Sequence, residues 1–96
     1  MESEKLLEKK LRDKIKQIGG WSLKLLSTHI TGLPDRLCLI PNGRLLFVEV
    51  KGTGLKPSPI QYSIHKKLRR LGFRVEVVDS SEQIISLIKE YETHSS

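Results

Sequence analysis

Residues 34–51, PDRLCLIPNGRLLFVEVK, hold two apolar runs on either side of Pro41-Asn42-Gly43. Apolar runs flanking such a turn predict a β-hairpin. The loop has either two residues, with Asn42-Gly43 in a type I′ turn, or three, with Pro41-Asn42 in a type I turn and Gly43 left-handed. Proline fits the first central position of a type I turn because its φ is preset, which favours the three-residue loop.

The choice of loop decides which side chains share a face of the hairpin. In the three-residue register Asp35 falls opposite Glu49, and Lys51 points to the same face because side chains alternate along a strand. The two-residue register would pair Asp35 with Val50 and separate the two carboxylates. In the favoured register the face below the acids carries an apolar floor of Leu37, Leu39, Leu45 and Phe47.

The rest of the chain alternates between helical and extended patterns. Helices are predicted over residues 4–18, over 59–71, and from Ser80 or Ser81 to Tyr91, the last with a buried stripe of Ile84, Ile85, Leu87 and Ile88. Strands are predicted over 21–27, 36–40, 44–51 and 73–78. The order is α-β-β-β-α-β-α. A crossover helix between the third and fourth strands makes that pair parallel, so we expect an α/β fold with a mixed β-sheet flanked by helices.

Length and composition limit the class of protein. Ninety-six residues predict a single domain spanning 1–96. The formal charge of +6 suits a nucleic-acid partner, and it suits an unspecialised basic surface equally well. No apolar run is long enough to cross a bilayer, and the charged N-terminus lacks a signal-peptide core, so no membrane association is expected. The single cysteine, Cys38, predicts a reducing cytoplasmic location, in a prokaryotic or virus-infected cell.

The two acidic residues and the lysine at the open end of the hairpin suggest metal chemistry. Adjacent carboxylates repel unless a cation lies between them, and oxygen ligands suit Mg²⁺ or Mn²⁺. Lys51 could then orient an attacking water or stabilise a transition state. The alternative is a structural cluster in which Glu49 pairs with Lys51 or Arg36 and Asp35 caps a turn. Because Glu49 ends a fully apolar strand, an odd position for exposed charge, we favour the functional interpretation.

Pro34-Asp35, thirteen intervening residues and Glu49-Val50-Lys51 resemble the PD-(D/E)xK nuclease signature. More narrowly, the chain resembles the VRR-NUC branch of that superfamily. The resemblance spans roughly residues 4–80 and rests on segments 7–11, 19–21, 32–36 and 47–51, on Gln61, and on segment 71–73.

This resemblance implies a restriction-endonuclease-like core and metal-dependent hydrolysis of DNA. Asp35, Glu49 and the backbone carbonyl of Val50 would hold Mg²⁺ or Mn²⁺, and Lys51 would be the catalytic lysine. Glu8 would reach the metal from the first helix. Stand-alone members of the family are homodimers that cut branched DNA, including four-way (Holliday) junctions, so the resemblance implies that substrate and that assembly here.

Two of the implied residues have structural alternatives. Glu8 borders the apolar stripe of its helix, and without the resemblance we would expect an exposed pair with Arg12. Gln61 fits a capping box with Ser58 at the start of the following helix, and we expect that role and a role in the site to exclude each other.

A set of basic residues could bind DNA phosphates, although such a set is more often a solvated face: Lys56, Lys66, Lys67, Arg69, Arg70 and Arg36. Tyr62 is expected to pack rather than to stack on a base. His29, His65 and His94 have no ligand spacing with Cys38, so no zinc site is predicted.

Three other functions fit the same sequence. They are a different PD-(D/E)xK nuclease such as a nicking enzyme or an archaeal-type resolvase, a catalytically silent DNA-binding module, and a basic adaptor for protein or RNA.

Overall fold

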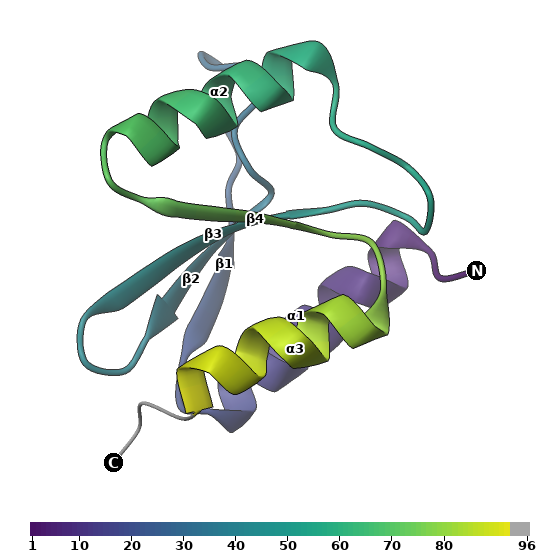
Figure 1. Ribbon diagram of the computed structural model, residues 1–96, viewed down its shortest axis with the longest axis vertical. Helices are drawn as coiled ribbons and strands as arrows, with labels where there is room; N and C mark the ends of the chain where they lie inside the picture. Colours follow the sequence, from purple (N-terminus) through teal and green to yellow (C-terminus); the bar gives the residue numbers. More distant parts are fainter. Residues whose placement is uncertain (93–96) are drawn as a thin grey trace.

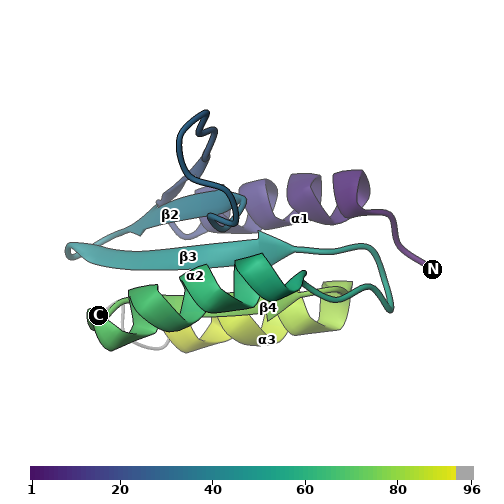
Figure 2. The ribbon, with the colours of Figure 1, turned by 90° about the horizontal axis from the view of Figure 1, so that it is seen from above.

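The computed structural model describes residues 1–92, which form a four-stranded sheet between two layers of helices. The elements are α1 (Glu4–Gln17), β1 (Trp21–Lys24), β2 (Arg36–Ile40), β3 (Arg44–Val50), α2 (Pro59–Arg70), β4 (Arg74–Val78) and α3 (Ser81–Glu92). Helix α2 covers one face of the sheet, and α1 and α3 cover the other (Figures 1 and 2). The strand order is β1-β2-β3-β4, with only β3 and β4 parallel, so the predicted element order and mixed sheet are confirmed.

The β2–β3 hairpin has the three-residue register. Ile40 pairs with Arg44 and Arg36 pairs with Val48, so the next position outward brings Asp35 to Glu49. The expected type I turn at Pro41-Asn42 is wrong, because Asn42 has a φ of 71° and Gly43 also has a φ of 71°. Asparagine is one of the few residues besides glycine that tolerate this left-handed conformation.

The main core lies between the sheet and helices α1 and α3. It contains Leu7, Leu11, Ile15, Cys38, Ile40, Leu46, Val48, Val50, Val78, Ile84, Leu87, Ile88 and Tyr91. The predicted burial of Ile85 is wrong, since it is 42% exposed and Tyr91 is buried in its place. The buried stripe of α3 therefore follows positions 84, 87, 88 and 91, one face of a 3.6-residue repeat, from which Ile85 is turned away.

Strand β1 ends at Lys24, three residues earlier than predicted. Its partner β2 begins at Arg36, so beyond Lys24 the pairing continues only as a hydrogen bond from Leu25 N to the Asp35 carbonyl at 2.8 Å. The chain then forms a loop that packs against α2 at Gly32. A Cβ atom at Gly32 would lie 2.9 Å from the carbonyl oxygen of Ile60, so this close approach requires glycine.

Glu2 joins three distant parts of the fold. Its carboxylate accepts hydrogen bonds from the backbone N–H of Ser81 at 2.8 Å, from the Ser81 hydroxyl, and from Lys10 Nζ at 2.8 Å. Its backbone N–H donates to Thr53 Oγ1 at 2.9 Å. The hydrogen bonds from Lys10 and Ser81 lower the pKa of Glu2 to about 2. We refer to Glu2, Lys10, Thr53 and Ser81 as the Glu2 clasp, which fixes the start of α1.

Replacement of Gly20 by alanine tests the packing where α1 passes into β1. A Cβ atom there would lie 2.7 Å from the Leu39 carbonyl oxygen and 2.9 Å from Ile15 Cγ2. We expect Gly20→Ala to lower the free energy of unfolding by about 1–3 kcal/mol through overpacking, measured by urea denaturation. Gly52→Ala is the matched control, because its Cβ would meet no atom closer than 3.5 Å. Equal stabilities of the two variants would contradict this account of the junction.

Candidate active site

Asp35 and Glu49 meet at the open end of the hairpin. Asp35 immediately precedes β2, and its Oδ2 accepts the backbone N–H of Val50 at 2.9 Å. Glu49 lies near the end of β3 on the face covered by α2, and it is fully buried. The two carboxyl groups are within hydrogen-bonding reach of each other. The register predicted from the sequence therefore brings the two acids together.

Burial of this pair changes the ionisation of Glu49. Loss of hydration is the largest effect, and the hydrogen bond and negative charge of Asp35 add to it, so the pKa of Glu49 rises from 4.5 to about 8. The charge of Lys51 acts in the opposite direction, and that of Glu4 on α1 raises the pKa further. At neutral pH the pair therefore retains a proton unless a cation replaces it.

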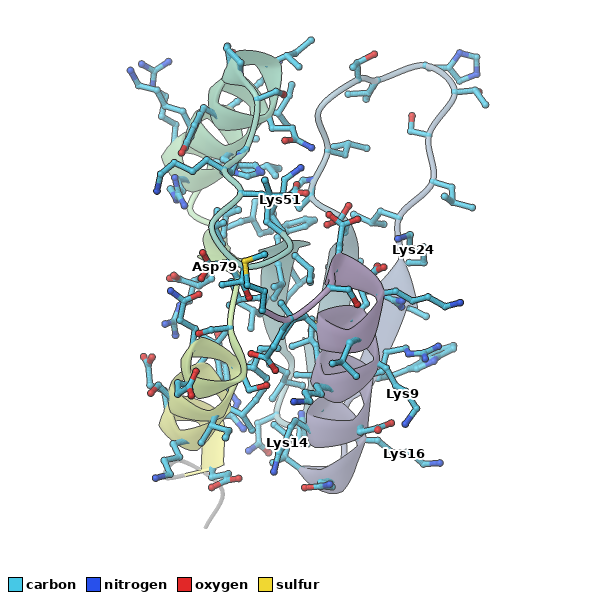
Figure 3. All side chains as sticks on the ribbon, turned by 90° about the vertical axis from the view of Figure 1, so that its right-hand side faces the viewer. Lys9, Lys14, Lys16, Lys24, Lys51 and Asp79 are labelled. Atoms are coloured by element: carbon cyan, nitrogen blue, oxygen red, sulfur yellow. The ribbon has the colours of Figure 1, made fainter. Side chains whose placement is uncertain are left out.

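Lys51 follows the strand and contacts Glu49. Its Nζ lies 3.7 Å from Glu49 Oε2, and its side chain is 18% exposed. Its backbone N–H donates to the Val78 carbonyl at 2.9 Å, which holds the residue beside β4. In the view of Figure 3, Lys51 lies below α2 and above α1. The ammonium group thus reaches both the buried acid and the solvent.

Gln61 completes the capping box of α2 and also contacts Glu49, two arrangements that were expected to exclude each other. Its Oε1 accepts the backbone N–H of Ser58 at 2.8 Å, and its own N–H donates to Ser58 Oγ, which completes the capping box of α2. Its Nε2 lies 3.4 Å from Glu49 Oε2. The expected conflict was wrong because the amide has an acceptor and a donor that face in different directions.

His65 is a residue of the site that the sequence analysis did not assign to it. It is fully buried, and its Nε2 lies 3.4 Å from Glu49 Oε1. Burial lowers its pKa, so the ring is neutral at neutral pH. Its Nδ1 is the one buried side-chain nitrogen or oxygen within residues 1–92 that has no hydrogen-bond partner. The signal was its spacing from Gln61, since residues four apart share one face of a helix.

Glu8 lies on the other side of the sheet and contacts basic residues of β1 and β2. Its Oε1 is 2.6 Å from Lys24 Nζ and 3.4 Å from Arg36 Nε, so its partners are these residues rather than Arg12. Arg36 is only 8% exposed and is held beside Glu8, so little of its side chain faces solvent. The acidic residue of α1 whose charge acts on Glu49 is Glu4, one turn earlier.

The predicted DNA-binding residues other than Arg36 lie on the surface. Lys56, Lys66, Lys67, Arg69 and Arg70 are exposed, although Arg69 also donates to the Val75 carbonyl at 2.7 Å. Tyr62 is 49% exposed, with its ring 6.4 Å from that of His65. No group of three or more His, Cys, Asp or Glu side chains is arranged to hold a metal anywhere in the described residues, 1–92. His94 lies outside them.

Two carboxylates, those of Asp35 and Glu49, and the backbone carbonyl of Val50 are the oxygen atoms that could hold a divalent cation here. Two ionised carboxylates as close as Asp35 and Glu49 repel each other, and this repulsion contributes to the raised pKa of Glu49. A cation between them would offset the repulsion. Carboxylate and carbonyl oxygens are the ligands that Mg²⁺ and Mn²⁺ prefer. The residues present therefore fit a hard divalent metal.

Comparison with known proteins identifies the family of this site. The model of the VRR-NUC domain matches residues 1–82. The chain belongs to the VRR-NUC family. A solved structure described as a VRR_NUC domain superposes with a TM-score of 0.87 at 35% sequence identity, covering 95% of this chain and 99% of that one. The resemblance inferred from the sequence motifs is thus confirmed.

A phage relative bears on the activity. The protein named "Putative nuclease p44" in Acyrthosiphon pisum secondary endosymbiont phage 1 is 43% identical over 76 residues, which is 79% of this chain and 82% of that protein. This relative and the VRR-NUC domain together support a nuclease. Within residues 1–92, no helix has both the length and the apolar character needed to span a membrane.

The raised pKa of Glu49 makes stability depend on pH when no metal is bound. The unfolded carboxyl ionises near pH 4.5 and the folded one near pH 8, so the folded state holds an extra proton between these values and loses stability as pH rises. We expect the free energy of unfolding in EDTA to fall by about 1 kcal/mol between pH 7 and 8.5. In Glu49→Gln, which cannot ionise, the decrease should disappear. An unchanged decrease would assign it to another group.

Proposed function

We propose that this VRR-NUC protein is a divalent-metal-dependent endonuclease that hydrolyses phosphodiesters in branched DNA, with four-way (Holliday) junctions as the preferred substrate. The observation that carries the proposal is the buried contact between Asp35 and Glu49, with Lys51 Nζ 3.7 Å from Glu49. A purely structural ion pair between Lys51 and Glu49 would not need Asp35 close enough to raise the pKa of Glu49.

Each residue has a proposed role. Asp35, Glu49 and the Val50 carbonyl would hold Mg²⁺ or Mn²⁺. When bound, such an ion polarises the phosphoryl group and lowers the pKa of a water ligand. Lys51 would stabilise the negative charge that develops on the phosphate, because its ammonium group reaches the solvent edge of the site. Gln61 would orient Glu49, whose Oε2 lies 3.4 Å from its amide nitrogen.

Basic residues around α2 would bind the DNA backbone near the site. Lys56 lies in the loop that follows Lys51, and Lys66, Lys67 and Arg70 are exposed on the helix that carries Gln61. Phosphate contacts of this kind position a duplex without reading its sequence. Their placement on the loop that follows Lys51 and on the helix that carries Gln61 supports DNA as the substrate.

We propose that the active form is a homodimer, as the family resemblance implies. A 96-residue chain is too small to enclose a duplex, and a two-fold dimer presents two sites to a two-fold junction. Exposed apolar side chains at the C-terminal end of α2 could form the contact: Phe73 is 43% exposed and Leu71 67%. Light scattering coupled to gel filtration measures the assembly.

A cleavage assay tests the proposed function. Labelled four-way junction, flap, nicked and linear DNA are each incubated with Mg²⁺, Mn²⁺ or EDTA. We expect metal-dependent cutting, fastest on the junction, and a loss of at least 10³-fold in Asp35→Asn and in Lys51→Ala with DNA binding retained. Asn can still accept the Val50 N–H bond, so Asp35→Asn keeps the local fold.

Two outcomes would overturn the proposal. Tight DNA binding without cutting in any metal would indicate a silent DNA-binding module. Cutting that persists in EDTA or in Lys51→Ala would show that the chemistry lies elsewhere. Preferential cutting of nicked or linear DNA would keep the nuclease and reject the junction preference.

His65 is expected to position Glu49 for the metal. Residues that hold a metal ligand in place typically contribute 10–100-fold in metal affinity. His65→Phe fills the same space without Nε2, so we expect Mn²⁺ binding measured by calorimetry to weaken by about tenfold or more. His65→Gln, which restores an amide donor, should recover part of the affinity. Tyr62→Phe is the control on the same helix. Wild-type affinity in His65→Phe would reject the positioning role.

A further inference from the structure

One flank of α1 carries a row of basic residues that the proposed site does not use. Lys5, Lys9, Arg12 and Lys16 are all exposed, and their spacing of four, three and four residues aligns them along the helix. Lys9 and Lys16 lie on the same side of α1, and Lys14 lies on the side nearer α3 (Figure 3). We refer to Lys5, Lys9, Arg12 and Lys16 as the α1 flank.

Little within the protein neutralises the α1 flank. Lys9 forms an exposed ion pair with Asp13 at 3.1 Å. Lys5, Arg12 and Lys16 form no salt bridge with any side chain of residues 1–92. Like charges three or four residues apart destabilise a helix, so helix stability does not explain this arrangement. A polyanion bound along the flank would remove the repulsion.

An exposed tryptophan stands next to the α1 flank. Trp21, the first residue of β1, is 65% exposed. Arg12, Lys16, Trp21 and the edge of Arg36 line a hollow of about 510 Å³, together with Gly20 and Ser22. Guanidinium and ammonium groups beside an exposed aromatic ring are the combination with which proteins hold phosphates and stack on bases or sugars.

The α1 flank begins near the candidate active site and leads away from it. Its first residue, Lys5, follows Glu4, whose charge acts on Glu49. From Lys5 to Lys16 the helix rises about 16 Å, which spans about five nucleotides of one DNA strand. The basic residues of α2 lie on the opposite face of the sheet (Figure 1). The protein thus carries two separate basic surfaces, with the acidic pair between them.

We propose that the α1 flank and Trp21 form a second DNA-binding surface, which holds the sugar-phosphate backbone of a DNA segment other than the one bound along α2. This inference rests on the proposed function, because it assumes that the substrate is DNA. Two segments held on opposite faces of one sheet suit a bent or branched DNA, so the α1 flank would contribute to the preference for junctions.

The salt dependence of binding tests this surface. The affinity of the full chain for a four-way junction is measured in EDTA at several salt concentrations, so that no cutting occurs. Each phosphate contact adds about 0.9 to the slope of log K against log salt. We expect the double variant Arg12→Gln/Lys16→Gln to reduce that slope by about 2 and to weaken binding at least tenfold. Lys14→Gln/Lys89→Gln removes the same charge away from the α1 flank and should change neither.

Trp21 provides an independent readout, because it is the only tryptophan of the chain. We expect junction DNA to quench its emission, with saturation at the concentration that saturates binding. In Arg12→Gln/Lys16→Gln the quenching should require at least tenfold more DNA. The emission of free protein should not depend on protein concentration.

Three results would overturn the inference. Equal losses in the two double variants would show that only net charge matters. Trp21 emission that saturating DNA leaves unchanged would place the DNA elsewhere. A shift of the emission with protein concentration alone would assign the surface to a second copy of the chain. In each case, cutting that still requires Asp35 and Lys51 would leave the proposed nuclease intact, whereas loss of that requirement would reject the nuclease separately.

Discussion

The odd number of residues in the β2–β3 loop is the constraint on which the candidate site depends. Side chains alternate across a strand, so a loop one residue shorter would turn every side chain of one strand to the other face. Asp35 would then lie away from Glu49, and the apolar side chains of one strand would leave their face. Asn42 and Gly43 make the three-residue loop possible, because both adopt a left-handed conformation that few residues tolerate.

The sequence allowed the fold and the central pair of acids to be predicted, because both follow from periodicity and turn length. It did not reveal which acid of α1 approaches the pair. Glu4 and Glu8 are one turn apart, and the choice between them depends on how α1 crosses the sheet. His65 was missed for a similar reason: a lone histidine has no pattern until its helix is docked against Glu49. Such distances are set by packing between elements.

The protein combines an acidic site with a basic body. Burial and the contact with Asp35 keep Glu49 protonated at neutral pH, while the formal charge of the chain is +6. The surface charge attracts a polyanion over distances of about 10 Å, whereas the buried pair acts only on what enters the site. The charges that attract DNA are therefore separate from the groups proposed to react with it. Substitutions on the surface can alter which DNA binds without altering Asp35 or Glu49.

The Glu2 clasp affects the order in which parts of the protein fold. Glu2 bonds to Ser81, 79 residues away, and to Thr53, 51 residues away. During synthesis, the start of α1 can reach its final position only after most of the chain has left the ribosome, since contacts between distant residues form late. The first turn of α1, which carries Glu4, would therefore settle beside Glu49 at the end of folding.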